Sequence, residues 1–414
     1  MNWIALKMLT GDKPKFFGIV LGLTFAALLI TQQGSIFCGL MLRTAAQITD
    51  ITGVDLWVMD PAVRFIDDTK PMLESNLYRV RGVDGVRWAV PLYKGNARAK
   101  LTPLGPDGKP KNVIEQVILL GLDDVSMVGA PPPERILAGK LIDLRQTDAV
   151  IVDRVGLRKL FPTLKGQVPP HPNELVGKFE SDGVTPKIDI LPSFIGQELE
   201  MNDHRAVIVG ICEATRTFQS NPVVYTTYSR AKGFVPRERK LLSYVLAQVE
   251  PGQDSSQVAA RIRTRTGLGA FTSDEFQWLT ISYYLKYTGI PINFGITVFL
   301  GFLVGTAIAG QTFYNFTLEN IKQFGALKAM GTTNTRIVGM VLMQATVVGL
   351  LGYGIGTGLA ALFGQRVQGT ELAFFTWWPV LPIAGAAVVL ICLLSSLISV
   401  RRVIVLEPAV VFRG

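Results

Sequence analysis

The sequence predicts an α-helical membrane protein with four transmembrane helices and a large mixed α/β extracytoplasmic domain between helices 1 and 2. Three observations support this fold class. The chain is 49% apolar and only 18% charged, whereas soluble domains carry roughly 25% charged residues. The missing charges are concentrated in four stretches that contain no Asp, Glu, Lys or Arg. The long segment between the first two stretches has the composition of a soluble domain.

Each uncharged stretch is long enough to cross a membrane, because about 20 apolar residues span a bilayer core of roughly 30 Å. Buried core helices are the alternative, but they are usually shorter and keep a polar face. We therefore predict transmembrane helices at residues 16–42, 287–318, 337–365 and 372–400. The first is predicted to be retained, since it is too long for a signal peptide and no small-residue cleavage site follows it.

The segments between these helices complete the predicted domain organisation. Trp3 or Ile4, Leu6 and Met8-Leu9 predict a short amphipathic helix on the cytoplasmic face of the membrane, and an unstructured terminus is the alternative. The other segments follow from the ends of the four helices. They are a cytoplasmic amphipathic N-terminus at 1–15, a periplasmic α/β domain at 43–286, a cytoplasmic loop with a short helix at 319–336, a short external turn at 366–371 and a cytoplasmic tail at 401–414.

Basic residues near the helix ends predict the orientation, because cytoplasmic loops carry an excess of Lys and Arg. The turn between the third and fourth helices has only Arg366 against Glu371. The N-terminus, the second loop and the tail hold Lys7, Lys13, Lys15, Lys322, Lys328, Arg336, Arg401, Arg402 and Arg413. We therefore expect a multi-pass protein of the bacterial inner membrane with both termini in the cytoplasm.

The periplasmic segment shows the patterns of a mixed α/β domain. Runs rich in β-branched residues predict strands at 54–59, 86–92, 113–122, 149–152, 205–211, 223–227 and 243–249. Helical periodicity predicts helices at 69–81, 154–161 and 255–266. Strands 205–211 and 223–227 are expected to pair with each other. Segments rich in Pro and Gly at 103–110 and 168–172 predict loops.

Composition and motifs argue against several functional classes. The net charge of +9 lies largely on the cytoplasmic flanks, where membrane orientation explains it, so nucleic-acid binding is not expected. No phosphate-binding loop, nucleophile elbow or zinc motif occurs, and His171 and His204 have no catalytic grouping around them. We therefore predict no catalytic residue, no metal site and no cofactor bound by this chain. A disulfide between Cys38 and Cys212 is left open beside the simpler expectation of three lone cysteines, Cys392 included.

Small residues recur four positions apart in the predicted helices. Gly301 and Gly305 form one pair, which Ala309 continues. Gly352 and Gly356 form another, and Gly354 and Gly358 repeat the spacing. Such residues let helix backbones approach closely, which favours helix packing or a dimer interface over the alternative that Gly is simply common in membrane helices.

The cytoplasmic segment 319–333 predicts a short helix that stops at Gly331. On a helical wheel, Ile321, Phe324, Leu327 and Met330 fall in one half, and Lys322, Gly325, Ala326 and Ala329 fall in the other. Two interpretations remain open at this point. The helix either docks into a groove on another protein or lies at the membrane surface as an ordinary amphipathic helix.

The sequence resembles the FtsX/MacB-type ABC transporter permeases. The run from Phe324 to Thr333, followed by a glycine-rich helix, is similar to the cytoplasmic loop of that family. The tail from Arg401 to Arg413, a basic pair followed by Glu-Pro-Ala, is similar to its closing segment. Within the family, residues 54–59, 148–153 and 217–220 resemble the DevC-type branch.

The resemblance implies a permease that uses the energy of ATP hydrolysis by a separate subunit. The short helix would be a coupling helix seated on that ATPase, with ATP and Mg bound by the ATPase and no enzyme activity in this chain. Its implied coupling residues are Ile321, Lys322, Phe324, Gly325, Leu327, Lys328, Met330 and Gly331.

The resemblance also implies partners and a substrate class. It implies a homodimer and, for the DevC-type branch, a periplasmic adaptor and a TolC-like outer-membrane channel that export an amphiphilic or hydrophobic substrate. Two alternatives stay open. One is a mechanotransmission protein that controls a periplasmic hydrolase or lipoprotein release without export, and the other is a membrane-anchored binding module.

Overall fold

The computed structural model describes residues 2–101, 113–154, 156–160, 191–192, 194–236, 242–367 and 372–405. The chain forms two compact units. We call them the helical unit (Met1–Leu40, Gly289–Gln368 and Leu372–Gly414) and the α/β unit (Met41–Thr288 with Gly369–Glu371). The predicted loops 103–110 and 168–172 lie outside the described residues.

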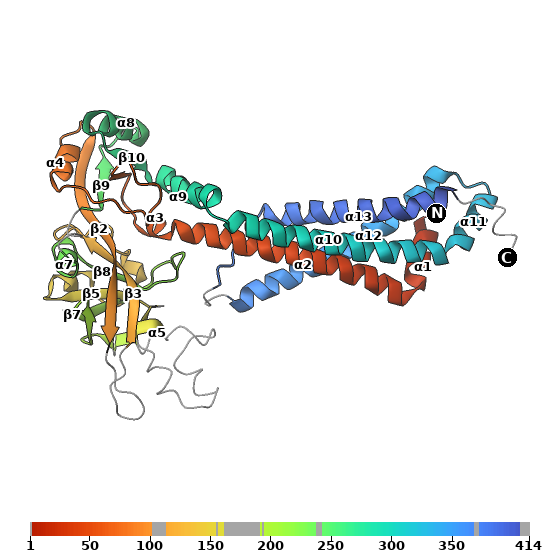
Figure 1. Cartoon of the computed structure of the whole chain (residues 1–414), viewed down its shortest axis with the longest axis horizontal. Coiled ribbons are helices and arrows are strands. Elements are labelled where there is room, and N and C mark those ends of the chain that lie inside the picture. The colour runs from red at the N-terminus through yellow and green to blue at the C-terminus, as the bar shows by residue number, and fades with distance from the viewer. Residues whose placement is uncertain are drawn as a thin grey trace, which may run out of the picture. The chain divides into compact units, whose positions relative to one another are not determined.

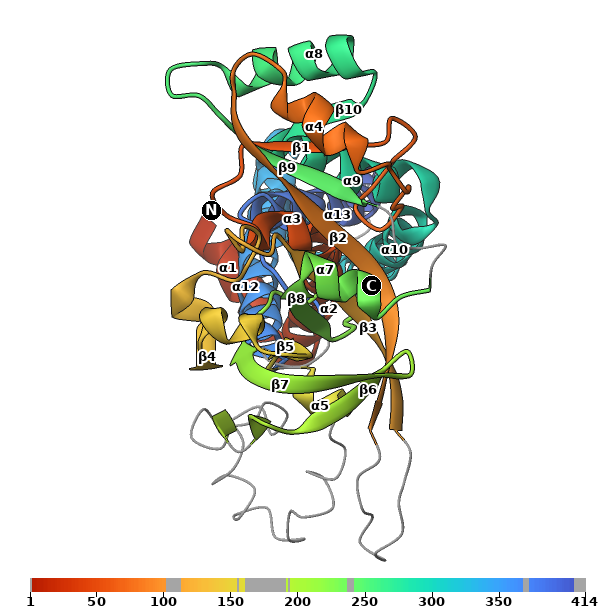
Figure 2. The same ribbon diagram turned by 90° about the vertical axis from the view of Figure 1, so that its left-hand side faces the viewer.

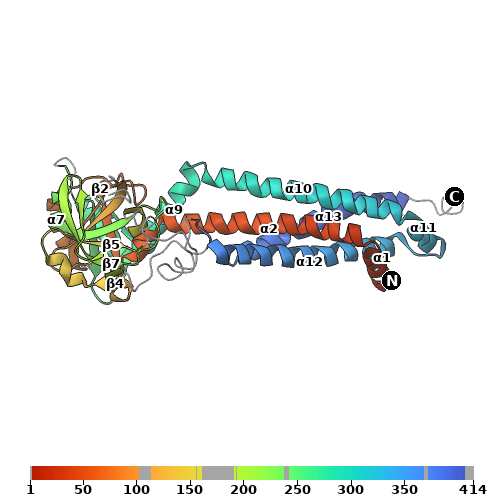
Figure 3. The same ribbon diagram turned by 90° about the horizontal axis from the view of Figure 1, so that it is seen from below.

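The helical unit contains the long apolar helices. Its elements are α1 (Asn2–Gly11), α2 (Lys13–Thr44, which continues into the α/β unit), α10 (Ile290–Glu319), α11 (Ile321–Ala329), α12 (Asn334–Val367) and α13 (Val380–Val405). Figures 1 and 3 show α2, α10, α12 and α13 running alongside one another. Among the described residues, these four helices are long and apolar enough to cross a membrane. The large α/β domain lies in sequence between the first and second of them, which confirms the predicted fold class.

Glycines bring the long helices into close contact with α2. A Cβ atom at Gly305 of α10 would lie 2.5 Å from Ala26 Cβ. The corresponding Cβ atom at Gly352 of α12 would lie 2.6 Å from Leu23 Cβ. Because real Cβ atoms do not approach other atoms so closely, only glycine allows these backbones to pack at this distance.

The segment that precedes α13 is fastened to α2. The Phe375 backbone N–H donates to the Ser35 carbonyl oxygen at 3.0 Å, and the Ser35 and Thr376 hydroxyl groups lie 3.2 Å apart. A Cβ atom at Gly39 would lie 2.9 Å from the Ala373 carbonyl carbon. The chain between α12 and α13 therefore packs directly on the backbone of α2.

The α/β unit is built on a mixed sheet. Its helices are α3 (Ala46–Asp50), α4 (Ser75–Arg81), α5 (Leu157–Leu160), α7 (Tyr228–Gly233), α8 (Ser255–Thr266) and α9 (Ser273–Tyr287). Its strands are β1 (Leu56–Met59), β2 (Val86–Leu101), β3 (Val113–Leu122), β4 (Ile136–Gly139), β5 (Ala149–Asp153), β6 (Glu198–Met201), β7 (His204–Cys212), β8 (Val223–Thr227), β9 (Tyr244–Val249) and β10 (Gly269–Thr272). Two 3₁₀ turns, Pro133–Arg135 and Leu141–Arg145, flank β4.

The described strands lie in the order β10-β1-β9-β2-β3-β8-β5-β7-β4, and β6 pairs with β2 and β7. β3 and β8 are parallel, as are β5 and β7, and the other pairs are antiparallel. The long strand β2 pairs with β9 through its first part and with β3 through its second part, so it belongs to both halves of the sheet (Figure 2). The predicted pairing of 205–211 with 223–227 is wrong, because β5 lies between β7 and β8.

One predicted helix is shorter than expected. The prediction of 69–81 included Lys70 and Pro71, but α4 begins only at Ser75. Met72 instead forms an isolated bridge with Leu242, each backbone N–H donating to the other residue's carbonyl oxygen. This pairing holds the chain extended. Pro71 also disfavours the helical conformation of the residue before it, Lys70.

A buried acid and a group of aromatic rings mark two parts of the α/β core. The Asp153 carboxylate accepts hydrogen bonds from the Gly156 and Val223 backbone N–H groups, and burial raises the pKa of Asp153 to about 7. Trp57, Tyr244 and Phe276 pack against one another, and all three are fully buried. All three cysteines of the chain are free, so no Cys38–Cys212 disulfide forms.

Candidate functional site

The predicted cytoplasmic helix forms as α11, between the ends of α10 and α12. Residues with high helix propensity (Lys, Gln, Ala and Leu) fill six of its nine positions. It ends in a Schellman motif, in which the Gly331 N–H donates to the Lys328 carbonyl oxygen at 3.0 Å and the Thr332 N–H donates to the Leu327 carbonyl oxygen at 3.1 Å. Gly331 has a φ of +86°, a conformation that favours glycine, so this residue sets the end of α11.

The inward face of α11 differs from the predicted docking face. Phe324 is fully buried and packs with Ile337 and Val341 of α12, while Met8 and Val400 cover it from α1 and α13. Gly325 is buried as well. Phe324, one of the predicted coupling residues, therefore faces the bundle, and its part in coupling stays a prediction. Its ring fastens α11 to the bundle, because a fully buried aromatic side chain contributes strongly to packing.

The outward face of α11 combines some of the predicted coupling residues with two alanines beside them. Met330 is 73% exposed. Lys322, Ala326, Ala329 and Gly331 are exposed too, whereas Ile321, Leu327 and Lys328 are half-buried. We call Lys322, Ala326, Ala329 and Met330 the exposed face of α11. It presents an apolar side chain, two small residues and one cation, a surface that can contact another protein without deep insertion.

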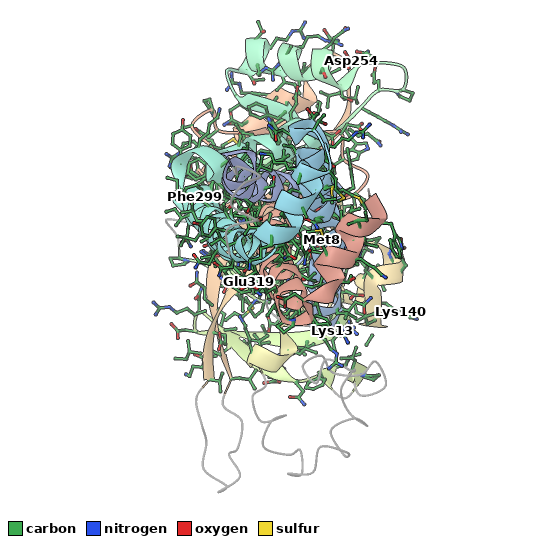
Figure 4. The ribbon with its side chains drawn as sticks, turned by 90° about the vertical axis from the view of Figure 1, so that its right-hand side faces the viewer. Met8, Lys13, Lys140, Asp254, Phe299 and Glu319 are labelled. Atoms are coloured by element: carbon green, nitrogen blue, oxygen red, sulfur yellow. The ribbon has the colours of Figure 1, made fainter. Side chains whose placement is uncertain are left out.

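α1 packs against the same end of the helical unit. Ala5 and Leu9 are fully buried, and the Gln344 side-chain amide of α12 donates to the Ala5 carbonyl oxygen at 2.7 Å. Figure 4 looks onto this end and labels Met8, Lys13 and Glu319. At the turn from α1 to α2, Lys15 forms ion pairs with Asp12 and Glu319. Its hydrogen bond to Asp12 lowers the pKa of that carboxyl group below its ordinary value.

The predicted small-residue pairs lie in two different environments. Gly301, Gly305, Gly352 and Gly356 all face α2 of the same chain. Gly305 and Gly356 are buried there, so neither is exposed to a second copy of the chain. Around Gly354 and Gly358, by contrast, a Cβ atom would meet nothing within 4 Å.

A loop that sequence analysis did not single out contacts two helices of the α/β unit, α3 and α9. Asp50 of α3 is buried and accepts hydrogen bonds from Arg135 at 2.7 Å and from the Thr215 N–H and hydroxyl groups at 2.7 and 2.6 Å. Three residues further on, the Phe218 ring lies 5.0 Å from the Tyr284 ring of α9. The loop after β7 therefore contacts both α3, which follows α2, and α9, which precedes α10.

The sequence offered only a weak signal for this contact. Asp50 is the first acidic residue after the first long helix, but its partners Arg135 and Thr215 are far away in the chain. Among the described residues, no group of three or more His, Cys, Asp or Glu side chains could hold a metal ion.

Comparison with known proteins identifies the part of the chain that carries α10 to α13. Residues 279–408 match the family model described as "FtsX-like permease C-terminal". These residues are similar to the FtsX-like permease family. The FtsX-like region includes α11 and Phe324 with its neighbours Ile337 and Val341, and the match agrees with the family resemblance of the cytoplasmic loop.

Related sequences point to the same family. An uncharacterized ABC transporter permease of Mycobacterium tuberculosis is 30% identical over 119 residues, which cover 29% of this chain and 33% of the relative. Another from Methanocaldococcus jannaschii is 23% identical over 180 residues, covering 42% of this chain and 44% of the relative. The chain thus matches about a third of the length of the mycobacterial relative.

Two solved structures share a weaker likeness. The extracellular domain of the noncanonic ABC-type transporter YknZ from Gram-positive bacteria aligns at a TM-score of 0.32 and 14% identity, covering 53% of this chain and 98% of that domain. The periplasmic region of MacB from Actinobacillus actinomycetemcomitans aligns at 0.35 and 13% identity, covering 58% and 96%.

Proposed function

We propose that the chain is the permease subunit of an ABC-type transporter, driven by a separate ATPase subunit that binds the exposed face of α11. One observation carries this proposal. α11 joins two long apolar helices in the FtsX-like region, is fastened to the bundle by the buried Phe324, and leaves Met330 73% exposed. A helix that is packed against the bundle on one face and exposed on the other can transmit a movement of a bound protein to the bundle.

The path from α11 to the α/β unit follows from the packing. α11 joins α10 directly at Asn320. α10 packs on α2 at Gly305. α2 and α10 are also the helices that continue in the chain toward α3 and α9. The loop held by Asp50 and Phe218 contacts both α3 and α9, so a movement of either helix acts on the sheet.

In this proposal both termini and α11 lie in the cytoplasm and the α/β unit lies in the periplasm. Basic residues flank α1 and α11, which agrees with this orientation. ATP and Mg are bound by the ATPase, and the permease acts as a homodimer. The movement of the α/β unit drives export of an amphiphilic or hydrophobic substrate through an adaptor and a TolC-like channel, as in the DevC-type branch.

The test is affinity purification of the tagged protein in mild detergent, with the co-purifying ATPase identified by mass spectrometry from its Walker A peptide. We expect wild type and Met330→Leu to retain the ATPase and Met330→Asp to lose most of it, since an interfacial charge without a partner is costly. Because Met330 is exposed, the variants should keep the thermal unfolding midpoint of the wild type. Equal retention by all three proteins, or no ATPase with wild type, would refute the proposal.

A further inference from the structure

A groove of about 530 Å³ lies at the end of the helical unit, between α1 and the start of α11. Trp3, Ile4 and Lys7 line it from α1, and Asn320 and Gln323 line it from the opposite side. Trp3 is 67% exposed and Ile4 is 40% exposed. The groove therefore offers open apolar surface beside amide groups.

The charges around the groove balance one another. The Lys7 ammonium lies over the Trp3 ring, 4.4 Å from its centroid. Asp12 and Glu319 also line the groove and share the single ammonium of Lys15. The Glu319 side chain is 58% exposed, so its carboxylate can accept further hydrogen bonds from outside.

These features fit a protein segment better than a membrane surface. Helices that lie on membranes insert an apolar face and carry many basic residues on the polar face. Part of the apolar surface of α1 packs on the bundle, because Ala5 and Leu9 are fully buried, while Trp3 and Ile4 line the groove. The carboxylates of Asp12 and Glu319 offset the ammonium groups of Lys7 and Lys15, so these four groups together give no net attraction to anionic lipid.

We infer that this groove is a second contact for the ATPase subunit and takes an apolar side chain flanked by Lys or Arg. The inference rests on the proposed function. The apolar side chain contacts Trp3 and Ile4, and the cation faces Glu319. Asn320 directly precedes α11 and Gln323 lies within it, so the groove adjoins this helix. One partner surface therefore covers the groove and the exposed face of α11 together.

Leu6 provides a matched control on the same helix. It is 36% exposed, close to the 40% of Ile4, but it does not line the groove. The photoreactive residue p-benzoylphenylalanine is placed at position 4 or position 6 of the full chain. Each variant is mixed with the recombinant form of the ATPase that the affinity purification identifies. We expect an ATPase cross-link from position 4, at a peptide with an apolar residue next to Lys or Arg, and at least about tenfold less from position 6. Equal yields, or a lipid adduct at position 4, would overturn the inference.

A binding measurement separates this inference from the proposed function. We expect Ile4→Asp to weaken ATPase binding about tenfold and Leu6→Asp to change it less than about twofold, with unchanged thermal midpoints as the folding control. If Met330→Asp weakens binding and Ile4→Asp does not, the groove assignment fails and the proposed function stands. If neither weakens it, both fail.

Discussion

Replacing single glycines of α12 by alanine should have opposite effects at neighbouring positions. A Cβ atom at Gly356 would lie 2.6 Å from the Thr24 carbonyl oxygen and 2.7 Å from Ala27 Cβ, whereas at Gly354 it would meet nothing within 4 Å. Carbon atoms pack optimally at about 3.5–4.0 Å, so Gly356→Ala must push α12 and α2 apart by close to 1 Å. Overpacking of this kind costs about 1–3 kcal/mol.

The change from Gly to Ala also has a favourable part. Ala stabilises a helix by about 1 kcal/mol relative to Gly, and this gain applies at both positions. We therefore expect Gly354→Ala to raise the free energy of unfolding by up to about 1 kcal/mol and Gly356→Ala to lower it by up to about 2 kcal/mol. Steric trapping in bicelles measures this free energy. A lower stability for Gly354→Ala than for Gly356→Ala would refute the contact between α12 and α2.

Three further predictions follow from individual residues. Phe324→Ala should lower the free energy of unfolding by about 3–5 kcal/mol, while Met330→Ala, at an exposed position, should stay within about 0.5 kcal/mol; chemical unfolding followed by circular dichroism distinguishes the two. Gly331→Ala should cost about 1–2 kcal/mol, because alanine is strained at a φ of +86°; a wild-type unfolding curve would contradict this. Burial raises the pKa of Asp153 from 3.8 to about 7. At pH values between these two pKa values, the carboxyl group is protonated in the folded state and ionised in the unfolded state. Stability should therefore fall as pH rises from about 4 to 7, by up to about 1.4 kcal/mol per pH unit, and Asp153→Asn should flatten this dependence in unfolding curves.

The parts of the fold that depend on local composition could be predicted from the sequence. Charged groups are expelled from hydrocarbon, so uncharged stretches mark α2, α10, α12 and α13 directly. The end of α11 was also predictable, because the turn after the helix has a positive φ that favours glycine, and Gly331 is the glycine at that place in the sequence.

The parts that depend on distant partners could not be predicted in this way. A helical wheel shows which residues share a face, but not which face the rest of the chain covers. Phe324 is buried by Met8 and Val400, which come from the two ends of the chain. Likewise, the position of β5 between β7 and β8 follows from the topology of the whole sheet, and neither strand carries a local signal for it.

The continuity of β2 has a consequence for how the α/β unit responds to force. Its 16 residues extend over roughly 50 Å, with β9 hydrogen-bonded along one part and β3 along the other. β9 also pairs with β1, which adjoins α9 through β10. β2 is therefore the covalent connection between the two halves of the sheet, and we expect a displacement near α9 to reach the second half through this strand.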